Sequence, residues 1–178
     1  MESTLVASAA EAPSDADLAF DSLYRSSRDD VYAYVAGLLR DAAAAEDVTA
    51  TAFERAYGKR SRFDPSRGEA RAWLFGIARN AALDELRRRG RQAALAMEPA
   101  DLAAAPAHES AEASERRLAV STALDALEPR ERELIALKFF AGLTNAEIAA
   151  VVGIGESNAG TRLHRAMTKL REACDGAV

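Results

Sequence analysis

Residues 71–91 read RAWLFGIARNAALDELRRRGR, and this stretch decides the fold of the first half of the chain. Leu74, Ile77 and Ala81 recur at three- and four-residue spacing, which predicts a helix over about 70–89 that Gly90 ends. The helix finishes in a run of arginines, although the whole chain carries a net charge of −5. A basic helix in an acidic chain favours a surface for a polyanion such as DNA. The alternative is a solvated helix end whose arginines lie at the favourable end of the helix dipole.

The composition excludes several classes of protein. The single cysteine, Cys174, excludes a disulfide within the chain and indicates a reducing compartment. With only His108 and His164 beside it, we expect no metal site and no cofactor. No apolar run approaches the roughly 20 residues that cross a bilayer, and the acidic start of the chain lacks the basic segment of a signal peptide. We therefore expect a cytoplasmic protein with no membrane insertion.

Charge is segregated along the chain. Residues 54–91 hold 11 basic and 5 acidic side chains, whereas residues 1–53 hold 3 basic and 10 acidic ones. A second, smaller basic segment covers residues 157–178 and follows another acidic stretch. Two basic segments indicate two places that could meet phosphates. The acidic total predicts that the free protein binds nucleic acid weakly.

The spacing of apolar residues predicts an all-α fold of two small helical domains. We expect a disordered tail over 1–16 and then a three-helix domain over 17–90. Its first helix covers about 17–40, and its second covers 42–59 with Asp41 as N-cap. Residues 91–112 contain two prolines, many alanines and no sustained apolar face, which is typical of a flexible linker. The second domain is expected over 113–174, with Pro129 at the first position of a helix.

The second domain contains a pattern typical of a helix-turn-helix. Residues 144–147, TNAE, form a capping box that opens a short helix. A glycine-containing turn over 153–155 and a longer basic helix over about 156–173 complete the motif. The start of this last helix would enter the major groove of DNA. It offers to bases and phosphates Ser157, Asn158, Thr161, Arg162 and Arg165. An ordinary helical hairpin without a DNA role remains the alternative.

Three segments of the first domain carry candidate binding residues. Asn80 and Asp84 lie four residues apart on the basic helix, where Asp84 could instead bond Arg87 or Arg88. Arg62, Phe63 and Arg67 surround the turn before it. They either hold an unstacked base or form a connector in which Phe63 fills the core. We assign Trp73 mainly to the core. In the helix over 42–59, Glu46, Asp47 and Thr51 form an acidic, small-residue face that suits a protein partner or solvent.

No set of residues suits catalysis. The two histidines lie in the linker and in the last helix, and the chain has neither a phosphate-gripping Gly-Lys-Ser loop nor a nucleophile elbow. The pairs Asp29-Asp30 and Glu46-Asp47 are adjacent, and adjacent residues on a helix do not converge on one site. We therefore do not expect an enzyme.

Three segments together resemble the extracytoplasmic-function (ECF) group of the sigma-70 family, the bacterial initiation subunits of RNA polymerase. AEDVTATAFERAY resembles the polymerase-binding helix, and RFDPSRGEARAWLFGIARNAALDELRRR resembles the segment that melts and reads the −10 element. LDALEPRERELIALKFFAGLTNAEIAAVVGIGESNAGTRLHRAMTKLR resembles the −35-reading domain. The resemblance covers about residues 17–90 and 115–173. It implies core RNA polymerase and promoter DNA as partners, and an anti-sigma factor as an inhibitor.

The resemblance also implies roles for individual residues. By this resemblance, the residues that bind polymerase are Glu46, Asp47, Thr51 and Phe53, with Phe53 internal. The residues that bind the −10 element are Arg62, Phe63, Asp64 and Arg67 of the loop, which capture a flipped base, and Asn80, Asp84, Arg87 and Arg88 of the helix. The residues that bind the −35 element are Ser157, Asn158, Thr161, Arg162 and Arg165.

Two pairs of residues depart from the family pattern. Ala50 and Thr51 stand where Gln and an acidic residue are frequent. Ala159 and Gly160 stand where Val and a basic residue are frequent, which implies fewer DNA contacts. A stand-alone helix-turn-helix regulator and an interaction module that sequesters polymerase are the two alternative functions.

Overall fold

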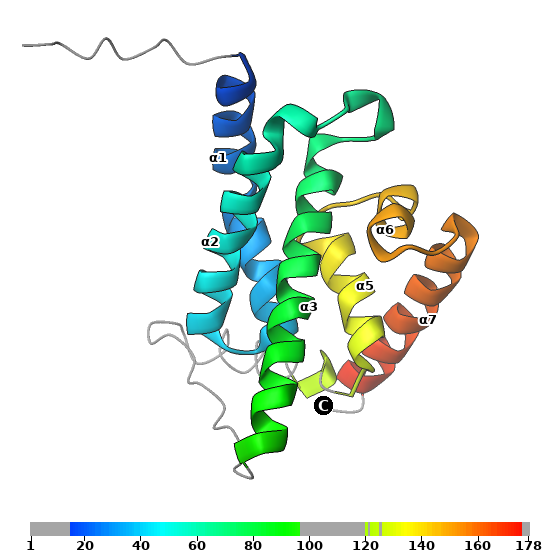
Figure 1. Cartoon of the computed structure of the whole chain (residues 1–178). Coiled ribbons are helices and arrows are strands. Elements are labelled where there is room, and N and C mark those ends of the chain that lie inside the picture. Colours follow the sequence, from blue (N-terminus) through cyan, green and yellow to red (C-terminus); the bar gives the residue numbers. More distant parts are fainter. Residues whose placement is uncertain (1–14, 97–119, 121, 125, 176–178) are drawn as a thin grey trace, which may run out of the picture.

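The described part of the computed structural model is helical and contains no strand. It comprises residues 15–96, 120, 122–124 and 126–175. The first half contains α1 (Asp15–Leu39), α2 (Ala42–Lys59), two short 3₁₀ turns (Arg60–Arg62 and Pro65–Arg67) and α3 (Ala70–Ala96). The second half contains α5 (Pro129–Phe139), α6 (Asn145–Val152) and α7 (Glu156–Asp175) (Figure 1). The all-α prediction is confirmed.

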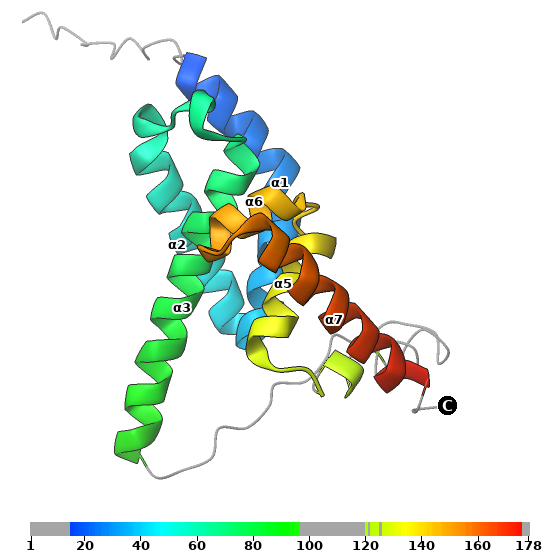
Figure 2. The same ribbon diagram turned by 90° about the vertical axis from the view of Figure 1, so that its right-hand side faces the viewer.

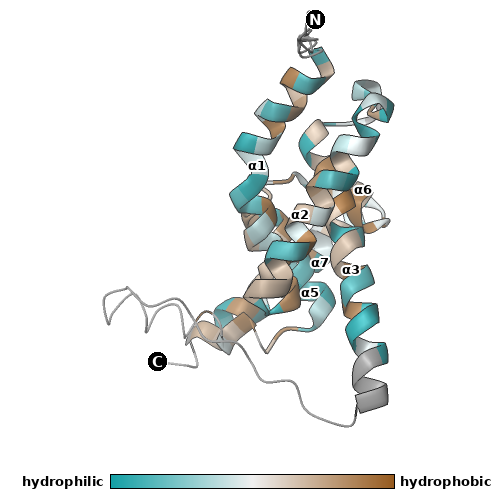
Figure 3. Cartoon of the chain, turned by 60° about the vertical axis from the view of Figure 1, so that its left-hand side comes forward, coloured by the Kyte–Doolittle hydropathy of each residue, from teal (hydrophilic) through white to brown (hydrophobic). Residues whose placement is uncertain are grey.

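The first half is a three-helix unit built around α1. Tyr34 of α1 and Phe75 of α3 are fully buried, and their rings meet edge to face with centroids 5.5 Å apart. Asp41 is the N-cap of α2, because its carboxylate accepts a hydrogen bond from the backbone N–H of Ala44 at 3.0 Å. Figure 3 shows hydrophobic and hydrophilic residues side by side along α1 and α3. The predicted second helix and its cap are confirmed.

Two predicted boundaries of this unit are wrong. The helix expected to end at Gly90 continues to Ala96, so residues 91–96 are helix rather than linker. A glycine inside a helix costs about 1 kcal/mol relative to alanine, and the following sequence RQAALA consists of good helix formers that offset this cost. The first helix begins at Asp15, inside the tail expected over 1–16. The rest of the predicted tail, 1–14, and of the predicted linker, 97–112, lies outside the described residues.

The second half follows the sequence prediction closely. Pro129 opens α5, and Thr144 caps α6 through a capping box with Glu147. Gly153 ends α6 with φ +78°, a left-handed conformation that favours glycine, and α7 begins three residues later. The short helix, the turn and the long helix form the predicted helix-turn-helix.

The two halves pack against each other. One cluster of buried apolar residues runs through both of them, from Val31 and Leu74 to Leu137 and Ile148. Helix α5 contacts α1, and α6 contacts α3 (Figures 1 and 2). This packing brings α6, the first helix of the helix-turn-helix, beside α3. The predicted division into two helical units did not anticipate the contact between them.

Candidate nucleic-acid interface

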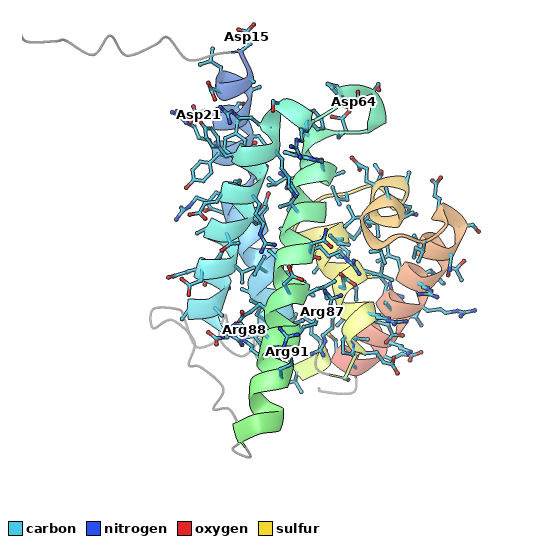
Figure 4. The ribbon with its side chains drawn as sticks, in the orientation of Figure 1. Asp15, Asp21, Asp64, Arg87, Arg88 and Arg91 are labelled. Atoms are coloured by element: carbon cyan, nitrogen blue, oxygen red, sulfur yellow. The ribbon has the colours of Figure 1, made fainter. Side chains whose placement is uncertain are left out.

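The arginines of α3 divide into an internal set and an exposed set. Arg71 and Arg79 are partly buried and bind groups of the second half of the chain. Arg87 and Arg88 have side chains 66% and 54% exposed. Figure 4 shows Arg87, Arg88 and Arg91 on the lower half of α3. The exposed cations therefore lie on the part of the helix after Asn80, where the sequence predicted contact with DNA.

A network of carboxylates holds the basic end of α3. The Glu85 carboxylate accepts hydrogen bonds from Arg88 at 2.6 and 2.7 Å and from Arg89 at 2.8 Å. These bonds, that of Arg88 first, lower the pKa of Glu85 from 4.5 to about 2. Arg89 also donates to the carboxylate of Asp41, the N-cap of α2, at 2.8 Å. Arg88 thus keeps an exposed guanidinium that is oriented by Glu85.

Asp84 connects two helices. Its carboxylate accepts hydrogen bonds from Arg87 at 3.2 Å and from Arg55 of α2 at 3.3 Å. The sequence left open whether Asp84 bonds an arginine of its own helix, and the structure contains that bond. Asn80, one turn earlier, is exposed. The exposed Asn80 amide, and the exposed guanidinium groups of Arg87 and Arg88 about two turns further along α3, are chemically suited to base edges and phosphates.

The loop before α3 is ordered by its own side chains. The Asp64 carboxylate accepts hydrogen bonds from the backbone N–H of Ser66 at 3.0 Å and from its hydroxyl at 2.7 Å. Gly68 has φ +143°, which a residue with a side chain rarely adopts. Phe63 is half-buried, and its ring lies 5.3 Å from that of Trp73, centroid to centroid. Phe63 therefore packs on the core helix while keeping part of its surface open, and Arg62 beside it is exposed.

The predicted protein-binding face of α2 is exposed in part. Glu46, Asp47 and Ala50 are exposed, Thr51 is half-buried, and Phe53 is buried. Phe53 packs against the ring of Tyr24 at a centroid distance of 4.8 Å, so its role is internal, as the sequence suggested. Of the four predicted residues, Glu46 and Asp47 are the ones that a partner can reach fully.

The helix-turn-helix presents its predicted reading residues to solvent. All five are exposed, namely Ser157, Asn158, Thr161, Arg162 and Arg165. The Thr161 hydroxyl donates to the backbone carbonyl of Ser157 at 2.9 Å, which fixes its orientation.

Ala159 and Gly160, the two departures in this helix, lie on its inner side. Ala159 is 1% exposed, and a Cβ at Gly160 would lie 3.4 Å from the Asn145 side chain. Small residues here let α6 and α7 approach closely. Ala159 therefore belongs to the core, and the expectation of fewer DNA contacts from this pair of residues stays a prediction.

Two family models match the chain. The model of sigma-70 region 2 matches residues 23–92, and the model of sigma-70 region 4 matches residues 117–170. The ECF RNA polymerase sigma factor SigK of Mycobacterium ulcerans (strain Agy99) is 30% identical over 163 residues, which cover 89% of this chain and 87% of SigK. The chain belongs to the ECF sigma factors.

Further relatives agree with this assignment. The ECF sigma factor SigL of Mycobacterium tuberculosis (strain ATCC 35801 / TMC 107 / Erdman) is 33% identical over 144 residues, covering 79% of this chain and 80% of SigL. The solved structure of the sigma factor RpoE with the anti-sigma factor NepR from Bartonella quintana matches with a TM-score of 0.77 and 25% identity, over 88% of this chain and 97% of that one. CnrH in complex with the cytosolic domain of CnrY matches with a TM-score of 0.67 and 25% identity, over 90% of each chain.

The structure of this sigma factor adds a groove that sequence reasoning missed. It lies between α1 and α2, has a volume of about 740 Å³, and includes Tyr24, Tyr32 and Thr49 in its lining together with Glu46. The Thr49 hydroxyl is buried and has no hydrogen-bond partner in the described structure. The helical spacing of two tyrosines on α1 was the available signal. Only the packing of α1 on α2 shows that they border the same space as Glu46.

Among the described helices, none combines the length and the apolar character that crossing a bilayer requires. The described residues also contain no group of three side chains suited to holding a metal ion.

Proposed function

We propose that this ECF sigma factor divides its contacts among three surfaces. The first is the polymerase-binding surface, formed by Glu46, Asp47 and Thr51 together with the groove between α1 and α2. The second is the −10 surface, formed by the loop over 61–69 and the exposed part of α3. The third is the −35 surface at the start of α7. The polymerase supplies phosphodiester synthesis, and the sigma factor itself catalyses no reaction.

One observation carries the assignment of the DNA surfaces. Arg87, Arg88, Arg162 and Arg165 are exposed, whereas Arg71 and Arg79 bind protein groups inside the fold. Exposed guanidinium groups bind phosphates and guanine edges, and internal ones cannot reach them. We assign binding of polymerase and of the −10 element to residues 17–90, and reading of the −35 element to residues 113–174.

The half-exposed ring of Phe63 supports a role in promoter opening. An aromatic ring beside exposed Arg62 can stack on an unpaired base while the guanidinium binds its phosphate. The Asp64–Ser66 hydrogen bonds hold the loop in one conformation, which lowers the entropic cost of capturing the base. We assign base capture to this loop.

Two neighbouring structures suggest a further partner. The matched RpoE chain is in complex with the anti-sigma factor NepR, and the matched CnrH chain is in complex with the cytosolic domain of CnrY. We infer that an anti-sigma factor also binds this chain, and that the chain acts in the cytoplasm, where polymerase and promoters are found.

In vitro transcription tests the function directly. Core RNA polymerase, a pool of genomic templates and this protein should yield promoter-specific transcripts that are absent without the protein. A stand-alone regulator would instead bind duplex DNA specifically without polymerase, and an antagonist would bind polymerase without producing a transcript.

A paired charge removal tests the −10 surface. The double variant Arg87→Gln/Arg88→Gln should weaken open-complex formation and leave the affinity for core polymerase unchanged. The matched control Arg25→Gln/Arg171→Gln removes two exposed cations elsewhere and should leave both unchanged. Loss of polymerase affinity in the first variant would reassign this part of α3 to the polymerase-binding surface.

The groove needs a separate measurement. Glu46→Gln/Asp47→Asn removes two exposed charges of α2, of which Glu46 lines the groove, and should weaken binding to core polymerase in a titration of labelled protein. The control Asp15→Asn/Asp21→Asn removes two charges at the far end of α1 (Figure 4). Equal effects of the two variants would contradict a specific polymerase-binding surface.

A further inference from the structure

A partly buried ion pair joins the start of α1 to the turn that leads into the loop over 61–69, which we call the base-capture loop. The Arg60 guanidinium donates from Nε to the Asp17 carboxylate at 2.8 Å. The two side chains are 31% and 29% exposed. Asp17 lies in the first turn of α1, and Arg60 is the C-cap of α2. Each charge therefore lies at the helix end whose dipole stabilises it.

Further contacts fix the side chain of Arg60. Its Nη1 donates to the backbone carbonyl of Tyr57, near the end of α2, at 2.9 Å. The guanidinium carbon also lies 3.8 Å from the centroid of the Tyr57 ring, which is within the range of a cation–π contact. That ring meets the ring of Phe20 of α1 edge to face, with centroids 5.2 Å apart. The end of α2 and the start of α1 therefore hold this guanidinium together.

The backbone of Arg60 continues into the base-capture loop. Arg60 opens the 3₁₀ turn Arg60–Arg62, and its carbonyl accepts a hydrogen bond from the backbone N–H of Phe63 at 3.3 Å. The Phe63 ring packs on that of Trp73 in α3. The start of α1 and this loop lie at the same end of the three-helix unit (Figures 1 and 2). A short series of contacts thus runs from Asp17 through Arg60 to Phe63.

We propose that Asp17 and Arg60 are positioning residues for the base-capture loop. Their ion pair fixes the 3₁₀ turn against α1 and thereby holds Phe63 where an unpaired base can stack on it. This inference rests on the base capture proposed above. It extends the residues that serve the −10 element to the first turn of α1, where the sequence predicted no binding residue.

A partly exposed ion pair is suited to setting the position of a loop. Because water screens the attraction, such a pair adds little to the stability of the whole fold. The apparent affinity for a ligand nevertheless falls with the fraction of molecules in the binding-competent conformation. Loss of the pair should shift the equilibrium between the positioned and the displaced loop about two- to fivefold. Capture of the base should weaken by up to the same factor.

Trp73 reports the position of the loop directly, because it is the only tryptophan of the chain. Acrylamide quenching of its fluorescence, measured on the full chain, shows how far the Phe63 ring shields it. Phe63→Ala gives the quenching constant without that shield. Asp17→Asn keeps the size of the side chain and should move the constant part of the way toward this value. An unchanged constant in Asp17→Asn overturns the proposal.

Matched variants separate the ion pair from a general loss of charge. Asp21→Asn removes an acid of α1 that binds Arg25 of the same helix at 3.2 Å, and it should leave the quenching constant unchanged. Asp17→Glu keeps the charge and should keep most of the shielding. In an Arg60→Gln background, Asp17→Asn should have no further effect, because both residues act through one contact. Additive effects at the two positions, or an equal effect of Asp21→Asn, would overturn the proposal.

Promoter opening tests the consequence for function. The template is a promoter found by the in vitro transcription described above, with abasic sites placed one at a time in the non-template strand of the −10 element. The abasic site that most weakens opening by the unchanged holoenzyme marks the captured base. On the intact promoter, Asp17→Asn should weaken opening by up to about fivefold, with unchanged affinity for core polymerase. On the promoter that lacks the captured base it should have no effect, whereas a general loss of stability would weaken opening on both.

The same assay separates this inference from the proposed function. If Phe63→Ala leaves opening unchanged, the assignment of base capture to this loop fails, whatever the effect of Asp17→Asn on the fluorescence of Trp73. If Phe63→Ala weakens opening and Asp17→Asn does not, base capture stands and positioning by the Asp17–Arg60 pair is refuted.

Discussion

Replacing Glu85 by glutamine tests how the basic end of α3 is organised. Glu85 is 12% exposed in its side chain and binds both Arg88 and Arg89. The variant keeps the shape of the side chain and removes its charge. Because the folded-state pKa of Glu85 is about 2 against 4.5 for an isolated carboxyl group, the charged form stabilises the fold. We therefore expect Glu85→Gln to lower the free energy of unfolding at pH 7.

The magnitude follows from the pKa difference and from solvent screening. A depression from 4.5 to about 2 corresponds to at most about 3 kcal/mol. Arg88 is 54% exposed, so water screens much of the attraction, and we expect about 1 kcal/mol. For a carboxyl group with a lowered pKa, this stability is complete above pH 4.5 and is lost as pH falls toward 2. At pH 3, about half or less of the difference should remain.

Urea denaturation at pH 7 and at pH 3 measures this difference. Glu172→Gln, which removes an exposed acid of α7, is the matched control and should change the unfolding free energy by less than about 0.5 kcal/mol. A loss of stability in Glu85→Gln that is equal at both pH values would refute the electrostatic argument, since it would arise from packing rather than charge.

The same variant has a functional consequence. In the wild-type protein, Arg88 must give up its ion pair with Glu85 before it can bind a DNA phosphate, and in the variant it need not. Promoter binding by the holoenzyme should therefore tighten at low salt. The slope of the logarithm of the binding constant against the logarithm of salt concentration should steepen by up to about 0.9, the value for one added phosphate contact. A shallower salt dependence would contradict the placement of Arg88 on the −10 surface.

Three further predictions concern other surfaces. Thr144→Ala removes the capping-box hydroxyl of α6 and should cost about 1 kcal/mol in urea denaturation, whereas Thr144→Ser should cost much less. Arg162→Gln should weaken protection of the −35 element in footprinting and reduce the salt dependence of promoter binding by about 0.9, with unchanged affinity for core polymerase. Phe53→Ala removes a ring that is 6% exposed, so it should lower the free energy of unfolding by about 3–5 kcal/mol. If the variant instead weakened polymerase binding and kept its unfolding free energy, Phe53 would be a contact residue.

Local features of the fold could be predicted from the sequence. The apolar spacing identified the helices, and the caps at Asp41 and Thr144 and the first helical position at Pro129 were located correctly. These features depend on neighbours within about four residues, which a pattern records directly. Two boundaries were exceptions. Helix α1 begins at Asp15 rather than at 17, and α3 continues past Gly90 because good helix formers follow it.

The use of each arginine depended on the tertiary structure. Arg79 and Arg87 belong to the same helix and look alike in the sequence, yet Arg79 binds a buried carboxylate and Arg87 is exposed. The difference arises because α5 packs beside α1 and brings Glu133 to one side of α3. The sequence pattern also could not show that the Phe63 ring packs on that of Trp73, or that Tyr24 and Tyr32 line the groove between α1 and α2.

The sequence by itself determined the helices, their caps and the residues available to meet polymerase and DNA. The tertiary structure alone decided which of these residues make internal contacts and which face solvent. The physical reason is that hydrogen bonds within a helix join near neighbours, whereas the Arg79–Glu133 pair joins residues 54 positions apart. Such a pair forms only when packing removes both charges from water at the same place.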